Sequence, residues 1–291
     1  MILNSCRSAD LIFKLAAKSV ETLRAIWYKS PTKEKPLILY GFCFETFSFG
    51  GDFLKEFKTL TLKDAYTTLK DFAGIPFKEL FPDKLTQIKE QKGCLGQQIE
   101  LLIGKSLDNR HLDFLDGELK TFPLKRSGKQ YKGFSSMAIC AISSDVDSYI
   151  HGISFEESVI GKKIANMILQ PVCKSGEVGD WYLPPAVHIG RDDDKYANLY
   201  EKIKTDYESI CREIKRIAES GENLKTLNGS NGLLQIRTKD SKNKSGRYHP
   251  IFLKHYNRFV SNKNYAFYFT SDFCKEIVAL NFEELSDPSS C

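Results

Sequence analysis

Patterns typical of helices and patterns typical of strands alternate along this 291-residue chain from about residue 59 onward. Helical spacing of apolar residues is followed repeatedly by short segments rich in β-branched and aromatic residues. This alternation predicts an α/β or α+β domain with a mixed central sheet flanked by helices. We expect helices in residues 59–81, 91–107 and 194–220, strands in residues 111–122, 135–143 and 232–240, and a strand followed by a helix in residues 264–282.

Two further segments carry more specific expectations. Residues 137–142 are continuously apolar, which predicts a strand in the centre of a sheet. Residues 154–172 are predicted to form a helix, because Ser154 is followed three residues later by Glu157, the pattern of a capping box.

The composition excludes several classes of protein. Hydrophobic residues make up 42% of the chain, so it can build a sizeable core and is not a disordered protein. Its apolar runs are far shorter than the roughly 20 residues that span a bilayer. The first residues lack the pattern of a signal peptide and are interpreted as a helix. These features predict a soluble cytoplasmic protein without membrane contact.

The eight cysteines, at positions 6, 43, 94, 140, 173, 211, 274 and 291, form no C-x-x-C pair. Zinc binding is therefore not expected. A disulfide framework is the alternative explanation of an even number, but a chain of this size needs no such stabilisation. We interpret the cysteines as reduced, buried, small apolar residues.

The first 56 residues differ from the others. A helical pattern in residues 11–27 is followed by an aromatic-rich stretch, residues 37–51, that ends in two glycines. Such a glycine pair is typical of a hinge or boundary. We interpret residues 1–56 as an N-terminal extension that adds a packing layer, and residues 57–291 as the main domain.

Positive charge is concentrated in two places. Residues 237–263 contain eight Lys or Arg and one acid, Asp240, and residues 120–132 contain five Lys or Arg and no acid. Such stretches form either solvated faces or binding surfaces for a polyanion, which clustered cations attract by releasing its counterions.

Residues 111–122, HLDFLDGELKTF, place charged side chains in an otherwise apolar strand pattern. Glu118 and Lys120 are two residues apart and share one face of a strand, as Asp116 would if the strand were regular. Asp113 joins that face only if a bend at Gly117 intervenes. Carboxylates of this kind can hold Mg²⁺ while an ammonium steadies a phosphate or a water, which is the chemistry of phosphodiester hydrolysis. A surface Glu–Lys ion pair is the alternative.

Five ordered motifs resemble a known family. KGCLGQQIELLIG, DFLDGELKTFPLKRSGK, FEESVIGKKIANMILQPV, LLQIRTKD and AFYFTSDFCKEIV are similar to segments of the MutH-like DNA endonucleases, which include the mismatch-repair endonuclease and type II restriction endonucleases that cut at GATC. The resemblance covers about residues 58–281. It implies a PD-(D/E)XK restriction-endonuclease-like core, with double-stranded DNA in a cleft between two subdomains.

The resemblance also implies roles for individual residues. Glu100, Asp113 and Glu118 match the metal-binding set for Mg²⁺, and Lys120 and Lys163 match catalytic lysines. Arg237, Lys239 and Tyr268 match residues that contact DNA, roles that suit an Arg reading guanine and a Lys contacting a phosphate or a base acceptor.

Two departures from the family pattern leave alternatives open. Asp113 and Glu118 enclose four residues where the family has six, so Asp116 is an alternative metal ligand. Thr238 stands where the family has proline, which leaves the loop freer and the base preference open. We expect a type II restriction endonuclease; the alternatives are a mismatch-repair nickase of hemimethylated DNA that works with repair partners, and a DNA-binding module without catalysis. A transient homodimer on DNA is a further expectation.

Overall fold

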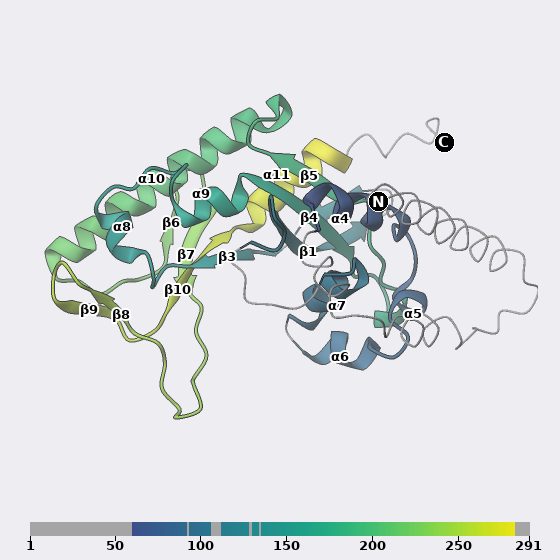
Figure 1. Cartoon of the computed structure of the whole chain (residues 1–291), viewed down its shortest axis with the longest axis horizontal. Helices are drawn as coiled ribbons and strands as arrows, with labels where there is room; N and C mark the ends of the chain where they lie inside the picture. The colour runs from purple at the N-terminus through teal and green to yellow at the C-terminus, as the bar shows by residue number, and fades with distance from the viewer. Residues whose placement is uncertain (1–59, 92, 106–111, 128–129, 134, 283–291) are drawn as a thin grey trace, which may run out of the picture. The chain divides into compact units, whose positions relative to one another are not determined.

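The computed structural model of the chain describes residues 60–91, 93–105, 112–127, 130–133 and 135–282 (Figure 1). The predicted N-terminal extension and its boundary at residue 56 lie outside these residues. Within them, the fold is a mixed arrangement of helices and several sheets, as the predicted α/β or α+β class requires. No helix in the described ranges is long and apolar enough to cross a membrane.

The first sheet is mixed. Its two central strands, β1 and β4, run parallel, and its outer strands pair antiparallel with them. β4 is buried along nearly its whole length, as expected for a strand covered on both faces. In spatial order the strands are β2 (Gln130–Gly133), β1 (Glu118–Ser127), β4 (Asn166–Cys173) and β5 (Val187–Gly190).

Four short helices pack against one face of this sheet. Leu119, Ile168 and Val172 form a core with residues of these helices, among them Ile99. The first helix begins at a capping box, in which Thr61 and Asp64 satisfy each other's backbone N–H groups. The helices are α4 (Leu62–Asp71), α5 (Phe77–Leu80), α6 (Leu85–Glu90) and α7 (Cys94–Leu102).

The second sheet is antiparallel throughout. The long helix α10 packs on β6 and β7 (Figure 1). Its buried residues recur at helical spacing, for example Ile203, Ile210 and Ile214, and the helix is capped by Gly221, which has φ 79°. In order the strands are β3 (Met137–Ala141), β10 (Tyr265–Phe269), β7 (Leu234–Thr238) and β6 (Leu227–Asn228), and the helix is α10 (Ala197–Ser220).

Other elements connect the two sheets. α11 contacts both β2 and β10, and α9 contacts both β3 and β4. The larger core is therefore shared by the second face of β1 and β4 and by the second sheet. α9 spans Val159–Ile164 and α11 spans Ser271–Phe282. The remaining elements are α8 (Val146–Ile150), the 3-10 turns η2 (Val178–Asp180) and η3 (Asp194–Tyr196), and the hairpin of β8 (Ile251–Leu253) and β9 (Arg258–Ser261).

Several predicted elements are confirmed. The helices in residues 59–81, 91–107 and 194–220, the strand in residues 232–240 and the strand and helix in residues 264–282 are all present, with shorter bounds. Five cysteines lie in the described ranges and all are free and buried, as expected of small apolar residues: Cys94, Cys140, Cys173, Cys211 and Cys274.

The prediction of one helix over residues 154–172 is wrong. Ser158 rather than Ser154 caps a helix, α9, that ends at Ile164, and strand β4 follows after Ala165. Ser154 and Glu157 do bond to each other, but in a turn before the helix. An apolar run such as that in β4 fits a buried helix or a buried strand equally well until its pairing partner is known.

Two strand predictions also need correction. β3 lies at the edge of its sheet among the described strands, although its apolar run predicted a central position; its neighbours β1 and α9 account for the burial. The strand predicted over residues 111–122 begins only at Glu118, and residues 113–117 form a bend instead.

A buried carboxylate fixes the turn that leads into β7. Asp206 of α10 is fully buried, and its carboxylate accepts hydrogen bonds from the backbone N–H groups of Asn231, Leu233 and Leu234, at 2.5, 2.7 and 2.9 Å. Three donors offset the cost of removing the charge from water. This interaction joins the long helix to the strand that carries Arg237.

We predict that Asp206→Asn lowers the free energy of unfolding by about 1–3 kcal/mol, because an amide nitrogen replaces one oxygen that accepts these bonds and leaves buried donors unsatisfied. Urea denaturation would measure the change. The matched control is Asp272→Asn, which alters an exposed carboxylate that pairs with Lys275. An equal effect of both substitutions would contradict the assigned role.

Candidate active site

Glu118 and Lys120 lie at the start of β1, on the face that looks toward the second sheet. Phe122 and Leu124 continue that face into the larger core, whereas Leu119 points to the opposite side. The Lys120 ammonium contacts Glu118 Oε1, so the predicted shared face is confirmed. Glu118 is 2% exposed and Lys120 is partly buried, which argues against a solvated surface pair.

A bend between residues 113 and 117 brings Asp113 to the same place. Phe114 N–H donates to Gly117 O across the bend. Asp113 N–H then donates to Glu118 Oε2 at 3.3 Å, while Asp113 Oδ2 accepts from Leu119 N–H at 3.0 Å. A Cβ on Gly117 would lie 2.4 Å from the carbonyl oxygen of Asn166. The bend is therefore possible at this position only because residue 117 is glycine.

Asp116, the alternative metal ligand, is placed elsewhere. Its Oδ1 accepts a hydrogen bond of 2.7 Å from the backbone N–H of Leu62, at the N-terminus of α4, and its side chain is exposed. A carboxylate there satisfies a free helix N–H and interacts favourably with the helix dipole. Asp113, not Asp116, accompanies Glu118.

The C-terminus of α7 positions a lysine that the sequence interpretation missed. Gly104 has φ 82°, and Lys105 N–H donates to Glu100 O at 2.9 Å while Gly104 N–H donates to Leu101 O, the two bonds of a Schellman motif. Lys105 therefore folds back over Glu100. A glycine just after the last apolar residue of the helix pattern is the sequence signal for this turn.

The side chain of Lys105 is only 4% exposed. Its Nζ lies 2.6 Å from Glu100 Oε2 and 3.4 Å from Asp113 Oδ1. Burial lowers the pKa of Lys105, but the hydrogen bonds and charges of Glu100 and Asp113 outweigh burial and raise the pKa above its ordinary value. Lys105 is thus a buried cation that connects Glu100 to Asp113.

Lys163 completes the cluster from the other side. It lies in the last turn of α9, just before β4, and Glu118 pairs with Met167 in the parallel ladder. Its Nζ donates to Glu118 Oε1 at 3.0 Å. Carboxylates and ammonium groups therefore alternate along one path, which we call the charged cluster: Glu100, Lys105, Asp113, Lys120, Glu118 and Lys163.

The charged cluster contains the donor type that Mg²⁺ prefers, because three carboxylates supply hard oxygen atoms. In the residues that the structure describes, no three His, Cys, Asp or Glu side chains are already arranged to hold a metal ion. Ammonium groups contact the carboxylate oxygens instead. Glu100, Asp113 and Glu118 have the chemistry to bind a divalent cation, provided that at least one ammonium moves aside.

Arg237 and Tyr268, which the resemblance assigns to one DNA-contacting surface, lie side by side on the second sheet. The guanidinium carbon of Arg237 lies 4.1 Å from the centre of the Tyr268 ring, and Arg237 Nη2 donates to Ser136 Oγ at 2.7 Å. The stacking orients the guanidinium, which remains partly exposed.

Lys239 follows β7 and lies near the charged cluster. Desolvation lowers the pKa of Lys239, and the like charges of Lys120 and Lys163 lower it further. No carboxylate in the described part of the chain pairs with its ammonium, and the residue as a whole keeps contact with solvent although surrounding protein atoms partly desolvate the ammonium. Lys239 is therefore a cation available to an anionic ligand beside Lys120 and Lys163.

The basic stretch after Lys239 is a projecting loop of residues 240–250 followed by the β8–β9 hairpin (Figure 1). Asp240 closes the loop by accepting hydrogen bonds from His249 N–H, His249 Nδ1 and Asn264 N–H. Desolvation raises the pKa of Asp240, but these hydrogen bonds outweigh it and lower the pKa to about 2. Asp240, the only acid in the sequence of residues 237–263, therefore joins the two ends of the loop.

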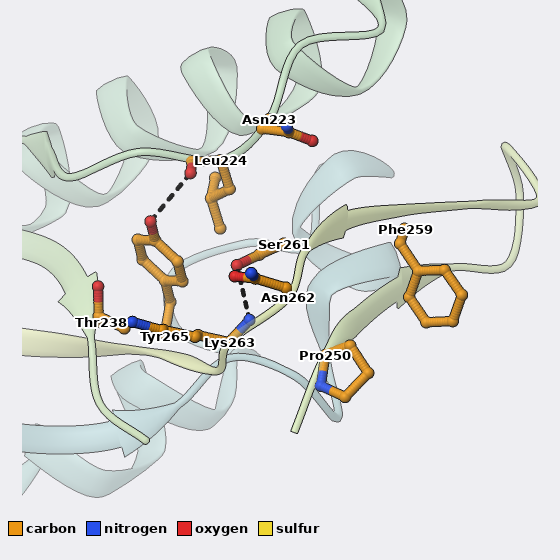
Figure 2. Close-up of a pocket in the computed structure, with 9 residues that line it drawn as sticks. All are labelled: Asn223, Leu224, Thr238, Pro250, Phe259, Ser261, Asn262, Lys263 and Tyr265. Carbon is orange, nitrogen blue, oxygen red and sulfur yellow. Dashed lines mark hydrogen bonds between the residues drawn. The ribbon is translucent and has the colours of Figure 1, made fainter. Parts of the chain in front are cut away.

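A pocket of about 750 Å³ lies near the end of α10 and contains none of the predicted site residues (Figure 2). Its lining is neutral apart from one ammonium group, and the Tyr265 hydroxyl in it is already bonded to Leu224 O. It therefore lacks the groups that acid–base or metal chemistry needs. The lining residues are Asn223, Leu224, Thr238, Pro250, Phe259, Ser261, Asn262, Lys263 and Tyr265.

The chain matches no known protein-family model and no curated protein sequence.

We predict that Gly117→Ala lowers the free energy of unfolding by about 1–3 kcal/mol, because its methyl group overlaps Asn166 O and Leu62. Gly190→Ala is the matched control: Gly190 also lies beside Asn166 in the first sheet, but a Cβ there meets nothing within 4 Å. Chemical denaturation of both variants would measure the difference. Equal stabilities of the two variants would contradict this prediction, because residues 113–117 could then adopt another backbone conformation without loss of stability.

Proposed function

We propose that the chain is a Mg²⁺-dependent endonuclease that hydrolyses double-stranded DNA at a short specific site, as a type II restriction endonuclease with a PD-(D/E)XK core. The observation that carries this proposal is the clustering of Glu118, Lys120 and Asp113 at the start of β1. Acidic oxygens beside an ammonium are the groups that metal-assisted phosphodiester hydrolysis uses. The parallel pairing of β1 with β4, with α9 immediately before β4 in the connection between them, is compatible with the proposed core.

Each side chain has a role in this proposal. Glu118 and Asp113, with Glu100 beside them, would hold the Mg²⁺ ion, which when bound polarises phosphoryl oxygens and lowers the pKa of a bound water. Lys120 donates hydrogen bonds to the attacking water and to the phosphoryl oxygen that gains negative charge. Lys163, on the other side of Glu118, holds that carboxylate in place and adds positive charge near the phosphate.

The second sheet supplies the proposed DNA surface. Arg237 can donate two hydrogen bonds to guanine O6 and N7. Lys239 contacts a phosphate, and Tyr268 supports the Arg237 guanidinium by stacking. The projecting loop of residues 240–250 adds further cations, because Asp240 is its only acid. Lys239 follows Arg237 by two residues, and the charges of Lys120 and Lys163 lower its pKa, so the proposed recognition surface borders the charged cluster.

Two biological roles are distinguished by one digestion experiment. A restriction endonuclease cuts both strands of an unmethylated site without help, whereas a mismatch-repair nickase cuts one strand of hemimethylated DNA weakly until its repair partners are added. Digestion of methylated, hemimethylated and unmethylated DNA with Mg²⁺, followed by end sequencing, separates the roles and identifies the site.

One observation favours a second candidate function, a DNA-binding protein that does not cleave. Three lysines contact the three carboxylates of the charged cluster, so the cluster is electrically balanced without a metal ion. Such a protein would bind DNA equally well with Mg²⁺ or with EDTA and would leave it intact.

We predict that Glu118→Gln and Lys120→Met each reduce the DNA cleavage rate by at least about 100-fold, because each removes a charge that acts at the scissile phosphate. Binding of uncleaved DNA, measured by fluorescence anisotropy with Ca²⁺, is expected to change little. The paired controls are Glu276→Gln and Lys202→Met, which alter a 3.0 Å ion pair between α11 and α10. Normal cutting by either cluster variant would overturn the proposal.

We predict that Lys239→Ala weakens DNA binding and reduces the slope of log K against log salt by about one unit, because one phosphate contact is lost. Lys275→Ala is the control, since Lys275 is an exposed lysine on α11 paired with Asp272. Binding titrations at four or more salt concentrations would measure both slopes. An unchanged slope in the Lys239 variant would remove this residue from the interface.

A further inference from the structure

Of the three lysines in the charged cluster, Lys105 has the least exposed side chain. Its position also differs from that of Lys120 and Lys163. Lys120 and Lys163 both contact Glu118, whereas Lys105 lies between Glu100 and Asp113, at 2.6 and 3.4 Å. Its side chain is 4% exposed, so water could not take the place of the carboxylates as partners of the ammonium. The two carboxylates stabilise the Lys105 ammonium, and the ammonium in turn stabilises the two carboxylates beside each other.

The backbone fixes this position as well as the side-chain contacts do. The Schellman bonds from Gly104 and Lys105 to α7 define where the Lys105 chain leaves the helix. Glu100 lies on the last full turn of the same helix. The lysine and its first partner are therefore parts of one local structure, and the contact does not depend on the packing of distant segments.

We propose that Lys105 is a positioning residue that acts as an internal counter-ion: its ammonium occupies the space between Glu100 and Asp113 and weakens the binding of a divalent cation by these carboxylates. The inference rests on the metal site of the proposed function. A unit positive charge among the ligands repels a divalent ion, and two carboxylates that already share a cation are less free to turn toward another. Lys105 thereby keeps the carboxylates ordered before the metal binds.

The inference predicts a change in metal affinity that does not depend on catalysis. Lys105→Met removes the charge and keeps a side chain of similar length, so the affinity for Mn²⁺ is expected to rise by about tenfold. Lys105→Arg keeps the charge and is expected to stay within about twofold of the unaltered protein. Lys202→Met, which removes a lysine paired with Glu276 far along the chain, is the control for net charge.

The experiment measures free Mn²⁺ by electron paramagnetic resonance in titrations of the full chain without DNA. Circular dichroism follows the fold of each variant with and without Mn²⁺. Without metal, Lys105→Met is expected to melt at a lower temperature than the unaltered protein, because two carboxylates lose their shared cation; Mn²⁺ should raise its melting temperature more than that of the unaltered protein. If Lys105→Met is unfolded without metal, Mn²⁺ is expected to restore its spectrum, and Lys105→Gln, whose amide still donates to Glu100, provides a second neutral variant.

The outcomes separate this inference from the proposed function. Tighter Mn²⁺ binding by the neutral variants alone supports the inference even if the protein never cleaves DNA. Affinity that is unchanged or weaker in folded Lys105→Met and Lys105→Gln overturns the inference, whether or not DNA is cleaved. Failure of both neutral variants to fold with Mn²⁺ overturns it too. Absence of Mn²⁺ binding in every protein, with DNA intact, overturns the inference and the nuclease proposal together.

Discussion

The geometry of the candidate site depends on the buried carboxylate of Glu118. A carboxylate this deeply buried remains in a folded protein only when several donors replace its water. Lys120, Lys163 and the backbone N–H of Asp113 provide them. These donors come from one strand, one helix and one bend, so that the start of β1, the end of α9 and residues 113–117 must all be in place around a single side chain.

The two sheets contribute different chemistry. The charged cluster gathers where β1 begins, from Glu118 and Lys120 of that strand and from α7, the bend before β1 and α9, whereas the second sheet carries Arg237 and Tyr268, which stack on each other. Asp206 secures the second sheet to the long helix by the same principle that operates at Glu118, a buried charge surrounded by donors. Under the proposed function, such contacts would help to hold the recognition side chains and the charged cluster in a fixed relative geometry.

Local sequence patterns predicted most of the elements, because helical spacing in α10 and the cap of α4 are properties of neighbouring residues. They failed where long-range pairing decides the structure. The apolar residues of β4 form a strand because β1 lies beside them, and β3 lies at a sheet edge because β10 is its partner. No periodicity within either segment contains that information.

The candidate site shows the same difference between local patterns, which the sequence reveals, and long-range contacts, which it does not. The two-residue spacing of Glu118 and Lys120 was sufficient to place them on one face, whereas the choice between Asp113 and Asp116 depended on Leu62, fifty-four residues from Asp116. Lys105 was not predicted, because the pattern of carboxylates contains no information about where α7 ends. Gly104, which precedes Lys105, is the local signal for the turn that places this lysine.

The junction between α9 and β4 has a consequence for how such a chain can diverge. Ala165 alone separates the helix from the strand, so one inserted residue would turn Lys163 by about 100° around the helix relative to β4 and take it away from Glu118. The loop of residues 240–250, by contrast, is closed at its base by Asp240 and can vary in length beyond that closure. Natural variation should therefore accumulate in the loop of residues 240–250 while the spacing between Lys163 and β4 stays constant, so that the loop can change in length and sequence without disturbing the charged cluster.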